Sequence, residues 1–169
     1  MKKYLPSFVC GFGAGVLQVV PVAKTFTCCL IIPAAAFLAI YLEKKSKSET
    51  VEIDLKKAAM IGLFTGLYAA LFGSFFDLFI TLVTKSNDIV AAFTEFQNLV
   101  INMPLDETLK NDVLDSMANV ADEIKGTGFS ILYSISVIIN NFIVNPIFGV
   151  IGGLIGVKVL NSKNPNMRI

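Results

Sequence analysis

The feature that most constrains this chain is a nearly unbroken apolar run at residues 129–160. With a rise of about 1.5 Å per residue, a helix of this length is longer than the ~30 Å hydrocarbon core of a bilayer. The run therefore predicts a helix that crosses a membrane. Its interruptions are polar or helix-perturbing residues: Asn140, Asn141, Asn145, Pro146, Gly149, Gly152, Gly153 and Gly156.

The distribution of charge extends this interpretation to the rest of the chain. Of the 169 residues, 54% are hydrophobic and only 16% are charged, whereas a soluble domain carries about 25% charged residues. Charged residues are absent from long stretches and cluster between them. The sequence predicts an all-α membrane protein with a single integral membrane domain over residues 1–169. Its four transmembrane helices are expected at about residues 5–20, 26–42, 58–83 and 129–158.

Residues 86–126 are polar but periodic, and they are expected to lie outside the membrane. Apolar side chains recur at three- and four-residue spacing on both sides of Pro104. This spacing predicts two amphipathic helices, with the proline at the start of the second. From Lys85 to Gly126 the chain has eight acids and three lysines. Because acidic helices do not seek anionic lipid, the pair could pack on itself, cap the bundle, or bind a second protomer or partner.

Basic residues beside the expected spans predict the orientation of the chain. Ten of them fall on one side, including Lys2, Lys3 and the lysines of residues 43–57, and only four fall on the other. Lysine and arginine are enriched in cytoplasmic segments. We therefore expect a multi-pass protein of the cell (inner) membrane, with both termini in the cytoplasm and the acidic helices outside.

Paired glycines predict where the helices approach one another. Four pairs have the G-x-x-x-G spacing, which lets helix backbones pack closely in lipid. The close contacts could form within the bundle or between protomers of a homo-oligomer, and the sequence does not choose between these. The eight glycines are Gly11, Gly15, Gly62, Gly66, Gly149, Gly152, Gly153 and Gly156.

Asp77 is the one acidic residue in any expected span, and ionisable groups in spans are functional candidates. Matched by depth, its expected partners are Tyr133, Ser134 and Ser136. Three roles are open: hydrogen bonding to a neighbouring helix, a link to ion or proton movement, and simple exposure at the membrane rim.

The asparagines of the last span form a second group of candidates. Asn141 and Asn145 share a helix face, and Asn140 lies next to them. Pro146 would free the carbonyl of Phe142 from its helical hydrogen bond. Broken helices with free backbone groups build ion and substrate sites in transporters, but they also occur as ordinary kinks. The group is therefore either a kink with polar helix-packing contacts or a binding site.

Several kinds of chemistry have no residues to support them. There is no histidine, which removes Ser-His-Asp and Cys-His catalysis and the H-E-x-x-H zinc motif. The cysteines, Cys10, Cys28 and Cys29, lack metal-binding spacing. The net charge is only +1, which argues against a nucleic-acid partner. We expect no catalytic, cofactor-binding or metal-binding residues.

The order of these motifs resembles a known kind of protein. The glycine cluster from Gly11 to Gly15, Pro33 in the second span, Gly73 before Asp77, and the glycines after Phe148 are similar to small four-span bacterial inner-membrane proteins of a family without an assigned function. The resemblance implies a helical membrane protein and no particular activity. The chain does not resemble small multidrug transporters, because its first span has Gln18 and no acid.

Two functions remain as expectations. The first is a non-enzymatic membrane protein that acts as an accessory, scaffold or oligomer through helix packing and its external helices. Its partners would be the lipid bilayer and either a second copy or another membrane protein. The alternative is a small transporter or channel that uses Asp77, Asn141 and Asn145.

Overall fold

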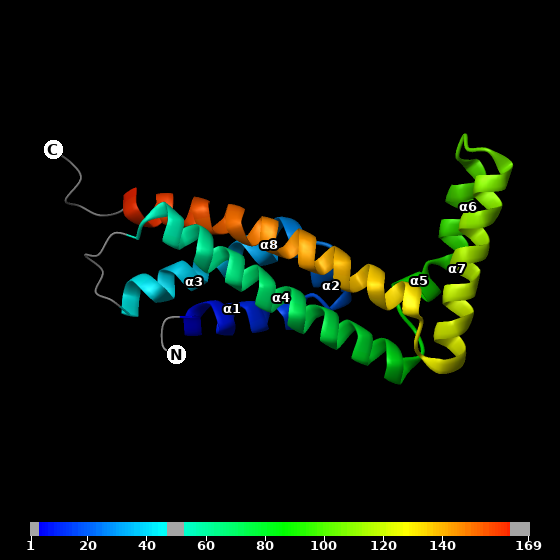
Figure 1. The fold of residues 1–169 in the computed structure, drawn as a ribbon, viewed down its shortest axis with the longest axis horizontal. Coiled ribbons are helices and arrows are strands. Elements are labelled where there is room, and N and C mark those ends of the chain that lie inside the picture. Colours follow the sequence, from blue (N-terminus) through cyan, green and yellow to red (C-terminus); the bar gives the residue numbers. More distant parts are fainter. Residues whose placement is uncertain (1–3, 47–52, 163–169) are drawn as a thin grey trace. The chain divides into compact units, whose positions relative to one another are not determined.

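The structure is a computed structural model that describes residues 4–46 and 53–162. Lys2, Lys3, Lys47, Lys163 and Arg168, which contribute to the predicted orientation, lie outside these residues. Every regular element in the described chain is a helix, which confirms the all-α prediction (Figure 1). The elements are α1 (Leu5–Leu17), α2 (Pro21–Lys24), a π-helix η2 (Thr27–Ile31), α3 (Ile32–Ser46), α4 (Leu55–Thr84), α5 (Asp88–Ala91), α6 (Phe93–Asn102), α7 (Glu107–Thr127) and α8 (Ile131–Ser162).

The chain divides into two compact units. Unit 1 comprises Met1–Phe76 and Ile138–Ile169, and unit 2 comprises Asp77–Val137. The helices α4 and α8 contribute residues to both units, so each unit contains parts of the two longest helices. Unit 1 also holds α1, α2, η2 and α3, whereas unit 2 holds α5, α6 and α7.

Helices α4 and α8 are long and apolar enough to cross a membrane. They contain 30 and 32 residues, which corresponds to roughly 45 Å or more for each helix. Helix α4 extends beyond its predicted span at both ends, whereas α8 begins two residues later and ends four residues later than predicted. By length and composition these are the candidate spans among the described residues, and the other two predicted spans remain predictions. The first of these falls on α1, which has 13 residues.

The second predicted span is not a single α-helix but a π-helix followed by an α-helix. Its first residues form the π-helix η2, in which the carbonyl of Phe26 accepts hydrogen bonds from the amides of Leu30 and Ile31. Pro33 is the second residue of α3, which continues directly from η2. A proline that follows helical residues removes one backbone hydrogen bond. The helix type changes from π to α at Ile32, one residue before this proline. Pro21, which lies between the first two predicted spans, begins the short helix α2, a position that suits proline.

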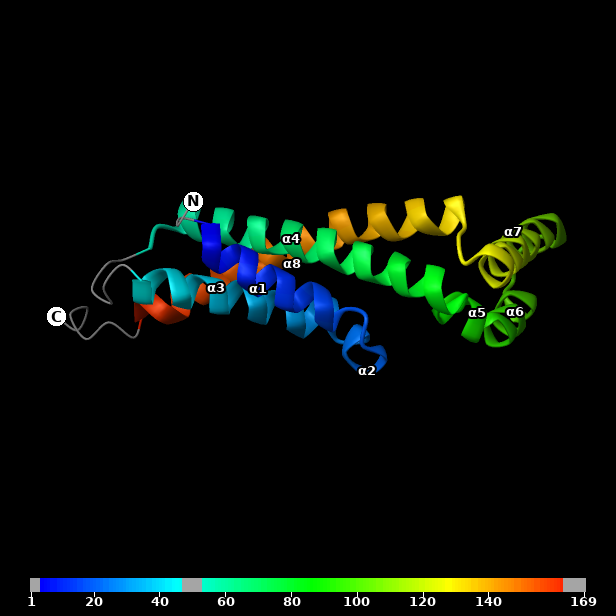
Figure 2. The same ribbon diagram turned by 90° about the horizontal axis from the view of Figure 1, so that it is seen from below.

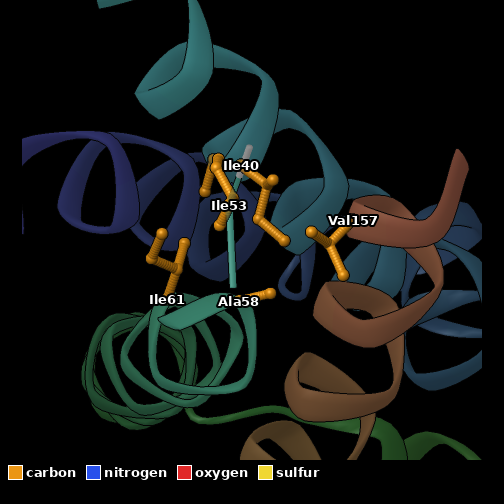
Figure 3. Packing of buried hydrophobic residues seen from close by; sticks show 6 residues of the cluster. Ile40, Ile53, Ala58, Ile61 and Val157 are labelled. Atoms are coloured by element: carbon orange, nitrogen blue, oxygen red, sulfur yellow. The ribbon is translucent and has the colours of Figure 1, made fainter. Parts of the chain in front are cut away.

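Small and branched apolar residues form the core of unit 1. One cluster brings together Ile40 of α3, Ile61 of α4 and Val157 of α8, with Ile53 and Ala58 beside them (Figure 3). A second cluster contains Ala14, Ile32, Ala35 and Ala69, so it joins α1, α3 and α4. Alanine at these positions allows the helices to approach closely.

Charged side chains near the end of α3 make polar contacts with other parts of unit 1. Glu43 is buried at the end of α3, and its carboxylate lies 2.8 Å from the ammonium of Lys57. Lys44 is also buried and donates a 2.8 Å hydrogen bond to the carbonyl of Leu160. A cation near the last carbonyls of a helix is favoured by the helix dipole. These contacts place charged residues of the segment 43–57 inside the folded unit.

Unit 2 is built around the antiparallel helices α6 and α7, which lie side by side in both views (Figures 1 and 2). Two helices were predicted here, and the structure has three. The first predicted helix is divided into α5 and α6, because Ala92 between them leaves the helical conformation. Pro104 lies ahead of α7, whose N-cap is Asp106. The core of the unit contains Val120, Ile124 and Tyr133.

Candidate functional site

The glycines of α4 and α8 bring two helix backbones into direct contact. A Cβ built on Gly62 would collide with the carbonyl oxygen of Gly149, and one on Gly149 would collide with that of Gly62. A Cβ on Gly153 would lie 2.6 Å from the carbonyl oxygen of Ala58. Gly66 lies in the same way against the backbone of Asn145. Four of the predicted packing glycines therefore leave no space for a side chain between α4 and α8.

The remaining glycines of the predicted set join other helix pairs of unit 1. Cβ atoms on Gly11 and Gly15 would lie 2.6 Å and 2.7 Å from the Cβ atoms of Tyr68 and Phe72 on α4. On α8, Gly152 lies against the backbone of Pro33, and Gly156 lies against Phe37. All eight glycines thus make their closest contacts within the chain.

A pair of buried amides connects α1, α4 and α8. Gln18, directly after α1, donates a hydrogen bond from Nε2 to the carbonyl of Ala69, 3.3 Å away. Asn145 of α8 donates from Nδ2 to Oε1 of Gln18 over 3.1 Å. Both side chains are buried. Gly73 makes room for the glutamine, because a Cβ there would lie 2.5 Å from Oε1. The amides therefore hold three helices together through polar contacts.

Asn141 makes the next contact along α8. Its Nδ2 donates a 3.0 Å hydrogen bond to the hydroxyl of Ser74 on α4, one residue beyond Gly73. Asn140 is exposed. The predicted asparagine group is therefore divided: Asn141 and Asn145 bond to neighbouring helices, whereas Asn140 lies on the surface.

The other predicted polar residues belong to unit 2. Tyr133 is buried and donates a hydrogen bond from its hydroxyl to a carboxylate oxygen of Asp77. Ser136 is exposed and donates to the carbonyl of Leu132 in its own helix. Ser134 bonds similarly to Ser130. Asp77 therefore accepts a hydrogen bond from Tyr133, which is one of its three expected partners.

Gln18 and Ser74 complete the polar cluster of unit 1, and neither was predicted as a site residue. Gln18 could have been found as the one strongly polar side chain near the end of the first expected span. Ser74 gave no comparable signal, since small hydroxyls commonly bond to their own helix backbone. To pair Gln18 with Asn145 and Ser74 with Asn141, one must know how far along its helix each residue lies in the folded bundle.

This polar cluster is suited to holding helices rather than to acid–base or metal chemistry. Within residues 4–46 and 53–162, no group of three or more histidine, cysteine, aspartate or glutamate side chains could hold a metal ion. The amide groups of Gln18 and Asn145 are neutral and bond to one another. In lipid, such bonds contribute about 0.6–2 kcal/mol to helix association.

Comparison with family models, with curated proteins and with solved structures finds no match to this chain.

Proposed function

We propose that the protein is a four-span integral membrane protein of the cell (inner) membrane, with both termini in the cytoplasm and α5–α7 outside. The observation that carries this proposal is the exposed apolar surface of α4 and α8. Only 33% and 39% of their most apolar windows are buried within the chain. A helix that is apolar on all sides and remains largely uncovered needs lipid around it, whereas a core helix of a soluble protein is mostly buried.

We further propose that the protein is not an enzyme and acts as an accessory or scaffold. The polar groups of the helices support this proposal because they are used in contacts within the chain: Asn145 with Gln18, Asn141 with Ser74, and Tyr133 with Asp77. The bundle would provide an anchor, and the external helices would present a surface to other molecules.

The topology is tested with single cysteines in a variant whose three native cysteines are replaced by alanine. Asn119→Cys on α7 and Lys24→Cys on α2 should react with a membrane-impermeant maleimide in intact cells. Lys45→Cys on α3 should react only after the membrane is permeabilised. If Asn119→Cys reacts in intact cells and Lys24→Cys does not, the number of spans is two rather than four. Labelling of Lys45→Cys in intact cells would reverse or exclude the proposed orientation.

A small transporter or channel is the second candidate. Pro146 supports it, because this proline lies inside α8 directly after the buried Asn145, and interrupted helices with polar residues build transport sites. Reconstituted protein should then move a solute across a vesicle membrane. Asp77→Asn and Asn145→Ala should abolish that flux while the fold is retained.

A further inference from the structure

One apolar stripe begins at Leu105, just before α7, and continues along this helix, and its two ends have different surroundings. We define the α7 stripe as Leu105, Leu109, Val113, Met117, Val120 and Ile124, which are spaced three or four residues apart. Ile124 is fully buried and Val120 nearly so, in the core around Tyr133. The exposed fraction rises to 49% at Leu109 and 39% at Leu105. A stripe that is continuous in sequence is thus covered at only one end.

More exposed apolar residues surround the uncovered end. Leu99 and Ile101 of α6 and Met103 of the connection to α7 are exposed, with fractions between 47% and 61%. We call these three residues together with Leu105 and Leu109 the hairpin tip. These five residues lie in or beside the turn between α6 and α7, and large exposed apolar side chains near one another commonly mark an interaction site. The core of unit 2 uses none of the five, since it is formed around Val120, Ile124 and Tyr133.

The surface around the hairpin tip is negatively charged. All eight acids from Lys85 to Gly126 are exposed, and three of them, Asp106, Glu107 and Asp112, neighbour Leu105 or Leu109 in the sequence. Two of the three lysines there are engaged: Lys85 donates to the carbonyl of Gly126 over 2.9 Å, and Lys110 lies 3.0 Å from Glu107. A bilayer with anionic headgroups would repel this surface, and a second copy would bring the same acids together. A positively charged partner would be attracted.

We propose that the hairpin tip and the adjoining α7 stripe bind a cationic amphipathic helix of a partner protein. The apolar face of the partner would cover Leu105 and Leu109, as in other complexes where an amphipathic helix binds an apolar surface. Its lysines or arginines would face exposed acids such as Asp106 and Asp112. The inference rests on the proposed function only in placing α5–α7 outside the bilayer.

The test uses the full-length protein in nanodiscs of zwitterionic lipid. The probe is a fluorescent synthetic helix with leucine at positions i, i+3, i+4 and i+7 and lysine elsewhere. Fluorescence anisotropy should show saturable binding in the micromolar range that weakens as salt is added, because salt screens exposed charges. Empty nanodiscs, and a probe with glutamate in place of lysine, should show no saturable binding.

Variants then locate the binding surface. Leu105→Ser combined with Leu109→Ser should weaken binding about tenfold or more, which corresponds to about 1.4 kcal/mol. Asn111→Ser is the matched control, because residue 111 lies about 200° around α7 from Leu109 and is exposed. Asp106→Asn combined with Asp112→Asn should weaken binding and reduce its dependence on salt.

Four results would overturn the inference. The first is a probe that binds no better than it does to empty nanodiscs, and the second is a leucine double variant that binds like the unaltered protein. The third is a homodimer that dissociates in that double variant, which would make a second copy the occupant. The fourth is quenching of a Leu105→Trp variant by brominated lipid, which would make the bilayer the occupant. Labelling of Asn119→Cys from outside tests the proposed function separately.

Discussion

At Gly62 the backbone of α4 lies against the backbone of α8 at Gly149, without room for a Cβ between them. The neighbouring atoms belong to the main chain, so no side chain can rotate away to make space. Gly13 on α1 provides the opposite case, because nothing lies within 4 Å of a Cβ built there. The two glycines therefore separate the effect of close packing from the ordinary effect of glycine in a helix.

We predict that Gly62→Ala destabilises the bundle by about 1–3 kcal/mol, since overpacking a tight contact forces backbone shifts. Gly13→Ala should be neutral or should stabilise by up to about 1 kcal/mol, because alanine favours helix over glycine. Unfolding of the purified protein in detergent micelles, titrated with SDS, would measure both. Equal effects of the two substitutions would contradict the contact between α4 and α8.

The amide pair gives a second prediction at this scale. In a double-mutant cycle, Gln18→Ala and Asn145→Ala should show a coupling energy of about 0.6–1.7 kcal/mol, the range for polar contacts between membrane helices. Asn140→Ala is the control, since Asn140 is exposed and should not couple to Gln18. Additive effects of the pair would contradict their hydrogen bond. Loss of solute flux in Asn145→Ala at unchanged stability would favour the transporter.

The sequence identified the glycines that form close contacts, but it did not identify the residue that each glycine contacts. The spacing of the glycines predicted small-residue contacts, and the structure places each of the eight against a backbone or side chain of unit 1. The partner of each glycine depends on the depth and rotation of its helix, which no spacing rule contains. The same limit explains why Gln18 was passed over although it meets Asn145.

At the level of elements, the corner between α7 and α8 depends on one glycine. Gly128 ends α7 with φ of +79°, a conformation that L side chains rarely adopt. A Cβ on it would also collide with the carbonyl oxygen of Leu82 at the end of α4. Both observations concern unit 2, and both require the residue to be glycine.

We predict that Gly128→Ala costs about 1–2 kcal/mol from the left-handed conformation alone, with a further cost from the collision. Gly126→Ala, two residues earlier, should be neutral or slightly stabilising, because it lies in the helix with nothing within 4 Å of its Cβ. Hydrogen exchange in α7 would report both changes. Unchanged protection in Gly128→Ala would show that α7 ends in another way.

Helix type and position were largely predictable at this scale, but breaks between helices were not. Apolar length predicted α4 and α8, and periodicity predicted α6 and α7. The π-helix before Pro33 and the interruption at Ala92 were missed, because both depend on local backbone geometry that propensity does not determine. Pro104 was assigned to a helix start, although the N-cap is Asp106, a preferred capping residue.

For the molecule as a whole, the glycine contacts bear on its oligomeric state. The eight predicted packing glycines make close contacts within the chain, so they are not available to a second copy. We predict that the purified protein in nanodiscs has the mass of one chain once lipid and scaffold are subtracted. Mass photometry or light scattering would measure it. A stable dimer would contradict this expectation and would require a different surface, such as the exposed face of α4 or α8.

The backbone contact between α4 and α8 also affects how the chain is assembled. Helix α8 is synthesised after α4 and must find it once the intervening helices have been made. A surface of glycines has no side-chain rotamers to restrict, so docking loses little conformational entropy. A shift of either helix by one residue would bring side chains into this gap, so the glycines fix the register in which Asn145 meets Gln18. The glycines thus determine where α8 comes to rest against α4, and the hydrogen bond between the amides of Asn145 and Gln18 forms in that register.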